Sequence, residues 1–102
     1  MTANELKDRV KLSIKIIDPE ARIILFGSKA RGDSKKNSDW DFLILTSRKT
    51  DTNLKMQIRN KLLDTELDAE EVISALIYSH KKWANYKTTP LYKNISKDGI
   101  EL

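Results

Sequence analysis

The sequence contains no cysteine. Disulfide bonds and metal sites with thiolate ligands are therefore excluded, and the absence of cysteine fits the reducing cytoplasm. No apolar run approaches the roughly 18 residues that span a bilayer, and the N-terminus lacks the hydrophobic core of a signal peptide. We therefore expect a cytoplasmic protein that makes no membrane contact.

Glycine and proline are also scarce, with three and two residues, and no linker, repeat or low-complexity segment is present. The 102 residues leave room for a single domain, residues 1–102. An apolar content of 39% excludes wholesale disorder, and a charged content of 33% indicates a heavily solvated exterior. The net charge of +4 is compatible with anionic ligands, although many soluble domains are mildly basic.

Apolar periodicity predicts that helices and strands alternate along the chain. A helix is expected over residues 2–17, where Thr2 and Glu5 have capping-box spacing. A second helix of about 14 residues should end near Glu66, and a third should begin at Pro90 and end before Gly99. Apolar runs predict strands at 22–26, 42–45 and 72–78, the last buried on both faces. This alternation predicts an α/β (α+β) fold, with helices packed on a sheet.

The first of two informative motifs is the turn Gly27–Gly32, which leaves a buried strand and starts a short helix. Free N–H groups at the helix start, the Ser28 hydroxyl and the Arg31 charge predict an anion site. The direction of Lys29, toward a ligand or toward solvent, stays open. The stretch is one letter from a Walker A loop, but Asp33 stands where lysine is required and would repel phosphates. A P-loop is therefore excluded.

The second motif is a pair of aspartates that leads into the next apolar run. In an extended chain Asp39 and Asp41 lie on one face, about 7 Å apart at their Cα atoms, and Trp40 points the other way. Two carboxylates so placed suit Mg²⁺, which also takes substrate phosphates. Each motif alone carries little information, because Gly-Ser turns are common and Asp-x-Asp at a strand end more often marks a solvated edge.

The combination is far more specific. Gly27-Ser28, Ala30-Arg31-Gly32 and Ser38-Asp39-x-Asp41 resemble the signature of the nucleotidyltransferase superfamily that includes DNA polymerase beta and kanamycin nucleotidyltransferase. The pattern is most similar to the minimal nucleotidyltransferases, which often pair with a HEPN-domain partner in toxin–antitoxin modules. The resemblance implies a nucleotidyltransferase fold, a small mixed sheet with helices packed on it and a metal site on its open side. It also implies transfer of a nucleoside monophosphate from an NTP, with ATP expected, to an acceptor hydroxyl by metal-assisted in-line attack.

The same resemblance assigns roles to individual residues. Asp39 and Asp41 would bind Mg²⁺. Gly27 and Ser28 would receive the β- and γ-phosphates through N–H and hydroxyl groups. Arg31 would add positive charge or brace an aspartate.

A third carboxylate is the element that the sequence does not supply clearly. Active members of the superfamily carry it on a neighbouring strand, where it completes the metal site and accepts the proton of the nucleophile. Val72 stands where that residue is expected, and valine binds no metal. Glu70 has the alternation parity of Val72 and Ser74 and can substitute if the strand begins early. Glu71 would face away without a bulge, and Asp68 is expected in a loop.

Three hypotheses follow. The first is an active nucleotidyltransferase that modifies a partner protein or another macromolecule, and the second is a catalytically degenerate member that serves as a binding or antitoxin subunit for a HEPN-type partner. The third, direct nucleic-acid binding, is disfavoured because its basic residues are scattered and no RNP-like, zinc-finger or helix-turn-helix pattern accompanies them. Those residues are Arg48, Lys49, Lys81 and Lys82. Because so small a domain has no helical module to hold an acceptor, we expect a second subunit of this chain or another protein to complete that site.

Overall fold

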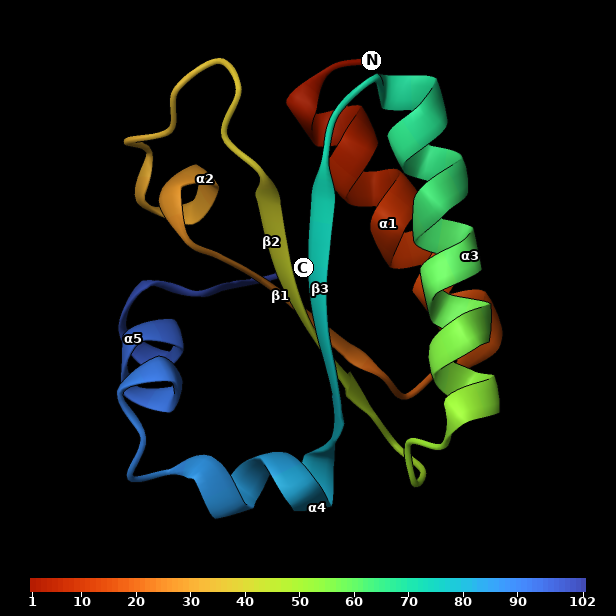
Figure 1. Ribbon diagram of the computed structural model, residues 1–102, viewed down its shortest axis with the longest axis vertical. Coiled ribbons are helices and arrows are strands. Elements are labelled where there is room, and N and C mark those ends of the chain that lie inside the picture. The colour runs from red at the N-terminus through yellow and green to blue at the C-terminus, as the bar shows by residue number, and fades with distance from the viewer.

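The computed structural model describes all 102 residues, and Figure 1 shows its arrangement. The helices are α1 (Ala3–Ile17), α2 (Ser28–Arg31), α3 (Thr52–Ala69), α4 (His80–Trp83) and α5 (Pro90–Asp98), with a 3₁₀ turn η1 (Ala84–Tyr86) after α4. The strands are β1 (Arg22–Phe26), β2 (Trp40–Thr46), β3 (Ile73–Ser79) and β4 (Ile100–Glu101). None of the helices combines the length and the apolar character needed to cross a bilayer.

The four strands form one mixed sheet in the order β3-β2-β1-β4. β1 runs antiparallel to both β2 and β4, whereas β2 and β3 are parallel. α1 and α3 lie side by side on one face of the sheet, and α4 and α5 lie on the other (Figure 1). The fold is therefore the predicted α/β class, a small mixed sheet with helices packed on it.

Each face of the sheet has its own hydrophobic core, because successive side chains of a strand point to opposite faces. Trp40, Phe42 and Ile44 belong to the larger core beneath α1 and α3. Leu43 and Leu45 belong to the smaller core on the other face, beneath α4 and α5. By the same alternation, Asp41 extends from the face of Leu43, opposite to Trp40.

The helix boundaries follow local sequence signals closely. At the start of α1 the Glu5 N–H donates to Thr2 Oγ1 at 3.1 Å and the Thr2 N–H donates to Glu5 Oε1 at 3.0 Å, so the predicted capping box is confirmed. Thr89 caps α5 and Pro90 is its first residue, as predicted. α3 has 18 residues and ends at Ala69, so it continues past the predicted end near Glu66.

The third strand begins one residue later than predicted, at Ile73, and lies at the edge of the sheet. Its side chains contact both cores, as predicted, with Leu76 and Tyr78 packed on the α4 and α5 side. Ile73 and Ile77 are buried against the α1 and α3 side, but Val72 is 56% exposed and Ser74 is also exposed. The apolar run indicated contact with both faces, but such a run does not distinguish an edge strand from a central one.

Asp18 is a buried carboxylate that connects the end of α1 to the end of β2. Its Oδ2 accepts a hydrogen bond from the Ser47 N–H at 2.7 Å, and its Oδ1 accepts from the Ser47 hydroxyl at 2.7 Å and from the Glu20 N–H at 3.2 Å. Burial raises the pKa of Asp18, but the hydrogen bonds from Ser47 and Glu20 outweigh it and leave that pKa below its usual value. The ionised carboxylate is therefore stabilised in the folded protein.

We expect Asp18→Asn to lower the free energy of unfolding by about 1–3 kcal/mol at pH 7, because buried donors lose a charged acceptor. Since the pKa of Asp18 is lowered on folding, its stabilising contribution is complete above the unfolded-state pKa of about 3.9 and is lost as pH falls through the folded-state pKa. The difference between wild type and variant should therefore shrink in acid. Urea unfolding at neutral and acidic pH measures it, and a difference independent of pH would contradict this role.

Candidate active site

The site begins at the turn between β1 and α2. Gly27 precedes α2 with φ 75° and ψ −158°, and Gly32 ends the helix with φ 83°. Both values of φ lie in the region that favours glycine. The Gly32 N–H donates to the Ser28 carbonyl at 3.0 Å, which closes this single helical turn. The two glycines thus fold the segment back on itself at the end of β1.

Strand register brings the turn against the second aspartate. Phe26, the last residue of β1, pairs with Asp41 on β2, so the turn that follows Phe26 lies beside the Asp41 carboxylate. A Cβ atom at Gly27 would collide with Asp41 Oδ2. Gly27 is therefore required for space as well as for its backbone angles, a contact that its place in the sequence did not reveal.

The two aspartates form a local concentration of negative charge. Asp41 is half-buried and Asp39 is exposed just before β2. Burial raises the pKa of Asp41 above its usual value, the neighbouring Asp39 charge raises it further, and Arg31 partly opposes both. Because their charges disfavour each other, and because the space over Gly27 admits a carboxylate oxygen, the pair fits one hard divalent cation with other coordination positions left open.

The two cations of the turn do not contact these aspartates directly. The Arg31 Nε lies 3.2 Å from Asp33 Oδ2 in an exposed ion pair. Lys29 places its Nζ 5.0 Å from the centroid of the Trp40 ring, which belongs to the opposite face of β2. The direction of Lys29, open in the sequence, is therefore toward Trp40, and Arg31 is the cation that acts electrostatically on Asp41.

The structure does not bring a third carboxylate to the aspartate pair. Asp41 pairs with Ser74 in the parallel β2–β3 register, so the neighbouring position on β3 carries a hydroxyl. No group of three or more acidic, histidine or cysteine side chains is close enough to hold a metal ion. Glu70 lies at the end of α3, where its N–H donates to the Glu66 carbonyl, and not in β3. The condition under which Glu70 could replace the third carboxylate from the strand, an early start of β3, is therefore not met.

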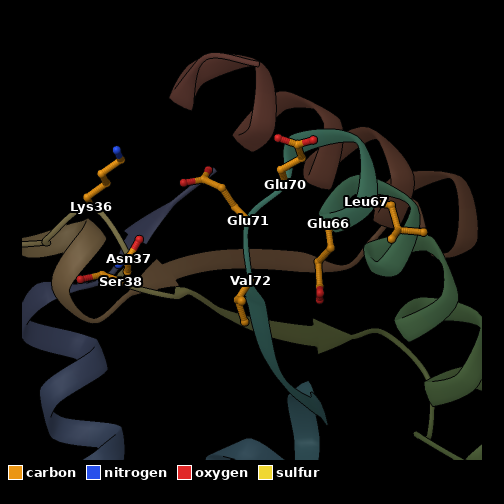
Figure 2. A pocket seen from close by; sticks show the side chains of 8 residues that line it. All are labelled: Lys36, Asn37, Ser38, Glu66, Leu67, Glu70, Glu71 and Val72. Carbon is orange, nitrogen blue, oxygen red and sulfur yellow. The ribbon is translucent and has the colours of Figure 1, made fainter.

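Glu70 nevertheless lines a hollow of about 480 Å³ beside the loop that leads to Asp39. The hollow lies between that loop and the α3–β3 connection, and its walls are formed by Lys36, Asn37, Ser38, Glu66, Leu67, Glu70, Glu71 and Val72 (Figure 2). In Figure 2 the Glu71 side chain extends toward the loop, whereas the Glu70 carboxylate points away from Ser38. A change of rotamer at Glu70 would therefore be needed to bring its carboxylate toward Asp39.

Glu71 has a structural role that the sequence prediction missed. Its Oε2 accepts a hydrogen bond from Trp40 Nε1 at 2.8 Å. Trp40 thereby connects α2, through Lys29, with the loop before β3, through Glu71. The available signal was Trp40 itself, because a buried indole N–H requires an acceptor.

The fold is a small mixed sheet with helices on both faces, and two aspartates stand at the start of β2, where Asp41 lies against the Gly27-Ser28 turn. The family model for "Polymerase beta, Nucleotidyltransferase" matches residues 14–101. The chain therefore belongs to this nucleotidyltransferase family.

Solved structures show the same fold in toxin–antitoxin proteins. A toxin–antitoxin structure with AMP-PNP aligns with a TM-score of 0.68 at 19% identity, covering 93% of this chain and 70% of that chain. A mutant of the toxin–antitoxin MntA-HpeT aligns with a TM-score of 0.61 at 19% identity, covering 100% of this chain and 72% of that chain. A comparison with curated proteins found no match.

Proposed function

We propose that this protein transfers a nucleoside monophosphate from an NTP, with ATP as the expected donor, to a hydroxyl group of a partner protein in the cytoplasm. The observation that supports the proposal is the contact between the Asp41 carboxylate and the Gly27 turn, because a metal-binding carboxylate and phosphate-binding groups would then act at one point. Membership of the nucleotidyltransferase family supports it. The structural neighbour with AMP-PNP supports the choice of an adenine nucleotide.

In the proposed reaction the acceptor oxygen attacks the α-phosphorus, the bond from that phosphorus to the bridging oxygen breaks, and pyrophosphate leaves. Gly27 and Ser28 bind the β- and γ-phosphates through N–H and hydroxyl groups, and Arg31 adds positive charge beside them. Asp39 and Asp41 would hold Mg²⁺, which when bound would neutralise phosphate charge and lower the pKa of the attacking hydroxyl. Because Asp41 lies against the turn, the nucleotide would be oriented with its phosphates toward Gly27 and Ser28.

We propose that Glu70 is the base that accepts the proton of the acceptor hydroxyl. The carboxylate of the neighbouring Glu71 already accepts a hydrogen bond from Trp40. Glu70, in contrast, is exposed and lines the hollow next to Ser38. Glu70 is also the one non-glycine residue with a positive φ, 55°, at a helix end where glycine is usual. A residue held in an unfavourable backbone conformation is more readily explained by a function than by stability.

Substitution of Glu70 separates its effect on catalysis from its effect on stability. Glu70→Gly should raise the free energy of unfolding by about 1 kcal/mol, because it removes the left-handed strain, and should slow transfer by about 10²-fold or more through loss of the base. Glu70→Gln should slow transfer equally and leave stability unchanged. Glu71→Gln is the matched control for charge. Unchanged transfer in the glycine variant, measured together with urea unfolding, would remove Glu70 from the mechanism.

The alternative function is that of a catalytically degenerate subunit, which binds and neutralises a HEPN-type partner by contact as an antitoxin. The observation that favours it is the place beside Asp41 on β3, where Ser74 stands and no third carboxylate lies. In both cases we propose that a partner completes the acceptor site, either a second protein or a second copy of this chain. The open edge at β3, beside the Glu70 hollow, is where such a partner would reach the aspartates.

ATP labelled at different phosphates decides between the two functions. The purified chain is incubated with an extract of its own cells, Mg²⁺ and ATP that carries the label in either the α- or the γ-phosphate. The proposal predicts a labelled protein band with the α-label only. Label from the γ-phosphate would indicate phosphoryl transfer instead, and a chain that binds its partner without labelling it would establish the degenerate subunit.

A further inference from the structure

Two pairs of basic residues, which lie far apart from each other in the sequence, line one hollow. Arg48 and Lys49 follow β2, whereas Lys81 and Lys82 belong to α4, directly after β3. β2 and β3 are parallel, and the register that pairs their final residues brings the two C-terminal ends together. The prediction that these cations are scattered is therefore wrong. The signal lay in the parallel pairing of the two strands, which sequence periodicity does not reveal.

The hollow is large, and all the residues that line it are polar or charged. Its volume is about 590 Å³, and no hydrophobic or acidic residue is among those that line it. Besides the four cations, the lining residues are Ser47, Ser79, His80 and Asn85. It lies at the opposite end of β2 from Asp39 and Asp41, and Figure 1 shows α4 at the far end of β3 from α2. The hollow is thus separate from the candidate active site.

None of the four cations has an ion-pair partner. The ion pairs of the chain are Arg9–Asp68, Arg22–Glu101 and Arg31–Asp33, all outside the hollow. The four positive charges of the hollow equal the net charge of the chain, +4, so the charges of the remaining basic and acidic residues cancel. Unpaired like charges in one concavity repel each other, and an anion that enters it is therefore attracted by all of them.

The backbone that carries these side chains is held in place. Asp18 binds both the N–H and the hydroxyl of Ser47, and the Thr46 hydroxyl donates to the Arg48 carbonyl at 2.6 Å. On the other side of the hollow, the Lys82 N–H donates to Ser79 Oγ at 3.1 Å. The next residue, Trp83, is buried against three tyrosine rings at centroid distances of 5.2–5.8 Å. The cations therefore extend from fixed positions rather than from a free loop.

We propose that this hollow binds the phosphate backbone of a nucleic acid without reading its sequence. Lysine and arginine side chains on a fixed backbone are the usual ligands of such phosphates. The lining residues include no Phe, Tyr or Trp for base stacking and no aliphatic residue, whereas the centre of a protein interface is normally rich in aromatic and apolar residues. A phosphate backbone therefore suits the hollow better than an acidic peptide does. The inference does not depend on the proposed transfer activity.

Fluorescence anisotropy with a labelled, mixed-sequence single-stranded RNA tests the proposal. The variant Arg48→Gln/Lys49→Gln/Lys81→Gln/Lys82→Gln should bind at least about 10-fold more weakly than wild type at low salt. Because each phosphate contact contributes about −0.7 to the slope of log affinity against log salt, the wild-type slope should be about −3 and should approach zero in the variant. The matched control replaces four exposed lysines of α1, α3 and α5 and removes the same charge: Lys11→Gln/Lys55→Gln/Lys61→Gln/Lys93→Gln.

Circular dichroism first establishes that both variants are folded. The proposal is supported if the control variant keeps RNA binding and the variant with the four substitutions in the hollow loses it. Equal losses in the two variants would mean attraction by net charge alone and would overturn it. Loss of RNA binding in Asp39→Asn/Asp41→Asn would place the RNA at the other end of the sheet, which also overturns it. Displacement of the RNA by poly-glutamate as readily as by unlabelled RNA would identify an acidic peptide as the occupant instead.

Discussion

Replacement of both Asp39 and Asp41 by asparagine is expected to abolish nucleotidyl transfer. Asp41 supplies the carboxylate that lies against the Gly27 turn, Asp39 is its charged neighbour, and the metal ion that we propose there is worth several kcal/mol of transition-state stabilisation. That corresponds to a loss of about 10³-fold or more in rate. The double variant should be at least as stable as wild type, because the mutual repulsion of the two carboxylates is removed.

The control for this variant is Asp8→Asn/Asp64→Asn, which removes the same charge from exposed positions on α1 and α3. It should transfer label from the α-phosphate of ATP at the wild-type rate. Transfer measured for all three proteins, with urea unfolding beside it, separates catalysis from folding. If the Asp39/Asp41 variant kept its activity, the site would have to lie elsewhere in the chain.

Gly27→Ala is expected to have the second-largest effect. The new Cβ would collide with Asp41 Oδ2, so the carboxylate must move away from the turn or the turn must open. A displacement of about 1 Å in a reacting site costs on the order of 10²-fold in rate. We therefore expect transfer, and the affinity for Mg²⁺ and nucleotide together, to fall by about that factor.

Gly32→Ala is the control for a positive φ, because both glycines have one and only Gly27 lies against Asp41. Gly32 is left-handed α, with φ 83° and ψ 12°, so alanine there should cost about 1–2 kcal/mol of stability. Gly27, with φ 75° and ψ −158°, lies in a region that is essentially restricted to glycine, so alanine there should cost more. A Cβ at Gly32 meets no atom within 4 Å. The control should therefore lose stability but keep nucleotide affinity, as measured by calorimetry. Equal loss of affinity in the two variants would mean that turn conformation, not contact with Asp41, is what the site requires.

The features predicted from sequence are those that short-range physics determines. The capping box at Thr2 and Glu5, the limits of β1 and the Thr89-Pro90 start of α5 are each set by neighbouring residues, and the structure confirms them. The turn at Gly27 and the extended aspartate pair were recognisable for the same reason. Their association as a nucleotidyltransferase motif came from resemblance, and the family match agrees with it.

The features that could not be predicted from the sequence depend on which strands are neighbours in the sheet. The edge position of β3 follows from the strand order β3-β2-β1-β4. It cannot be inferred from the residues Ile73–Ser79 alone. The same parallel pairing places Ser74 beside Asp41. It also gathers the basic residues that follow β2 and β3 into one hollow. Glu70 does not join β3, because helix α3 continues to Ala69 and leaves too few residues for an earlier strand.

The central claim is that Asp39, Asp41 and the Gly27-Ser28 turn form a metal-dependent nucleotide site. Calorimetric titration of a non-hydrolysable ATP analogue into the wild-type chain, with and without Mg²⁺, tests it without knowledge of the acceptor. The account predicts that one analogue binds per chain and that binding requires Mg²⁺. A folded chain that binds no analogue, or that binds it equally well without the metal ion, would contradict the account.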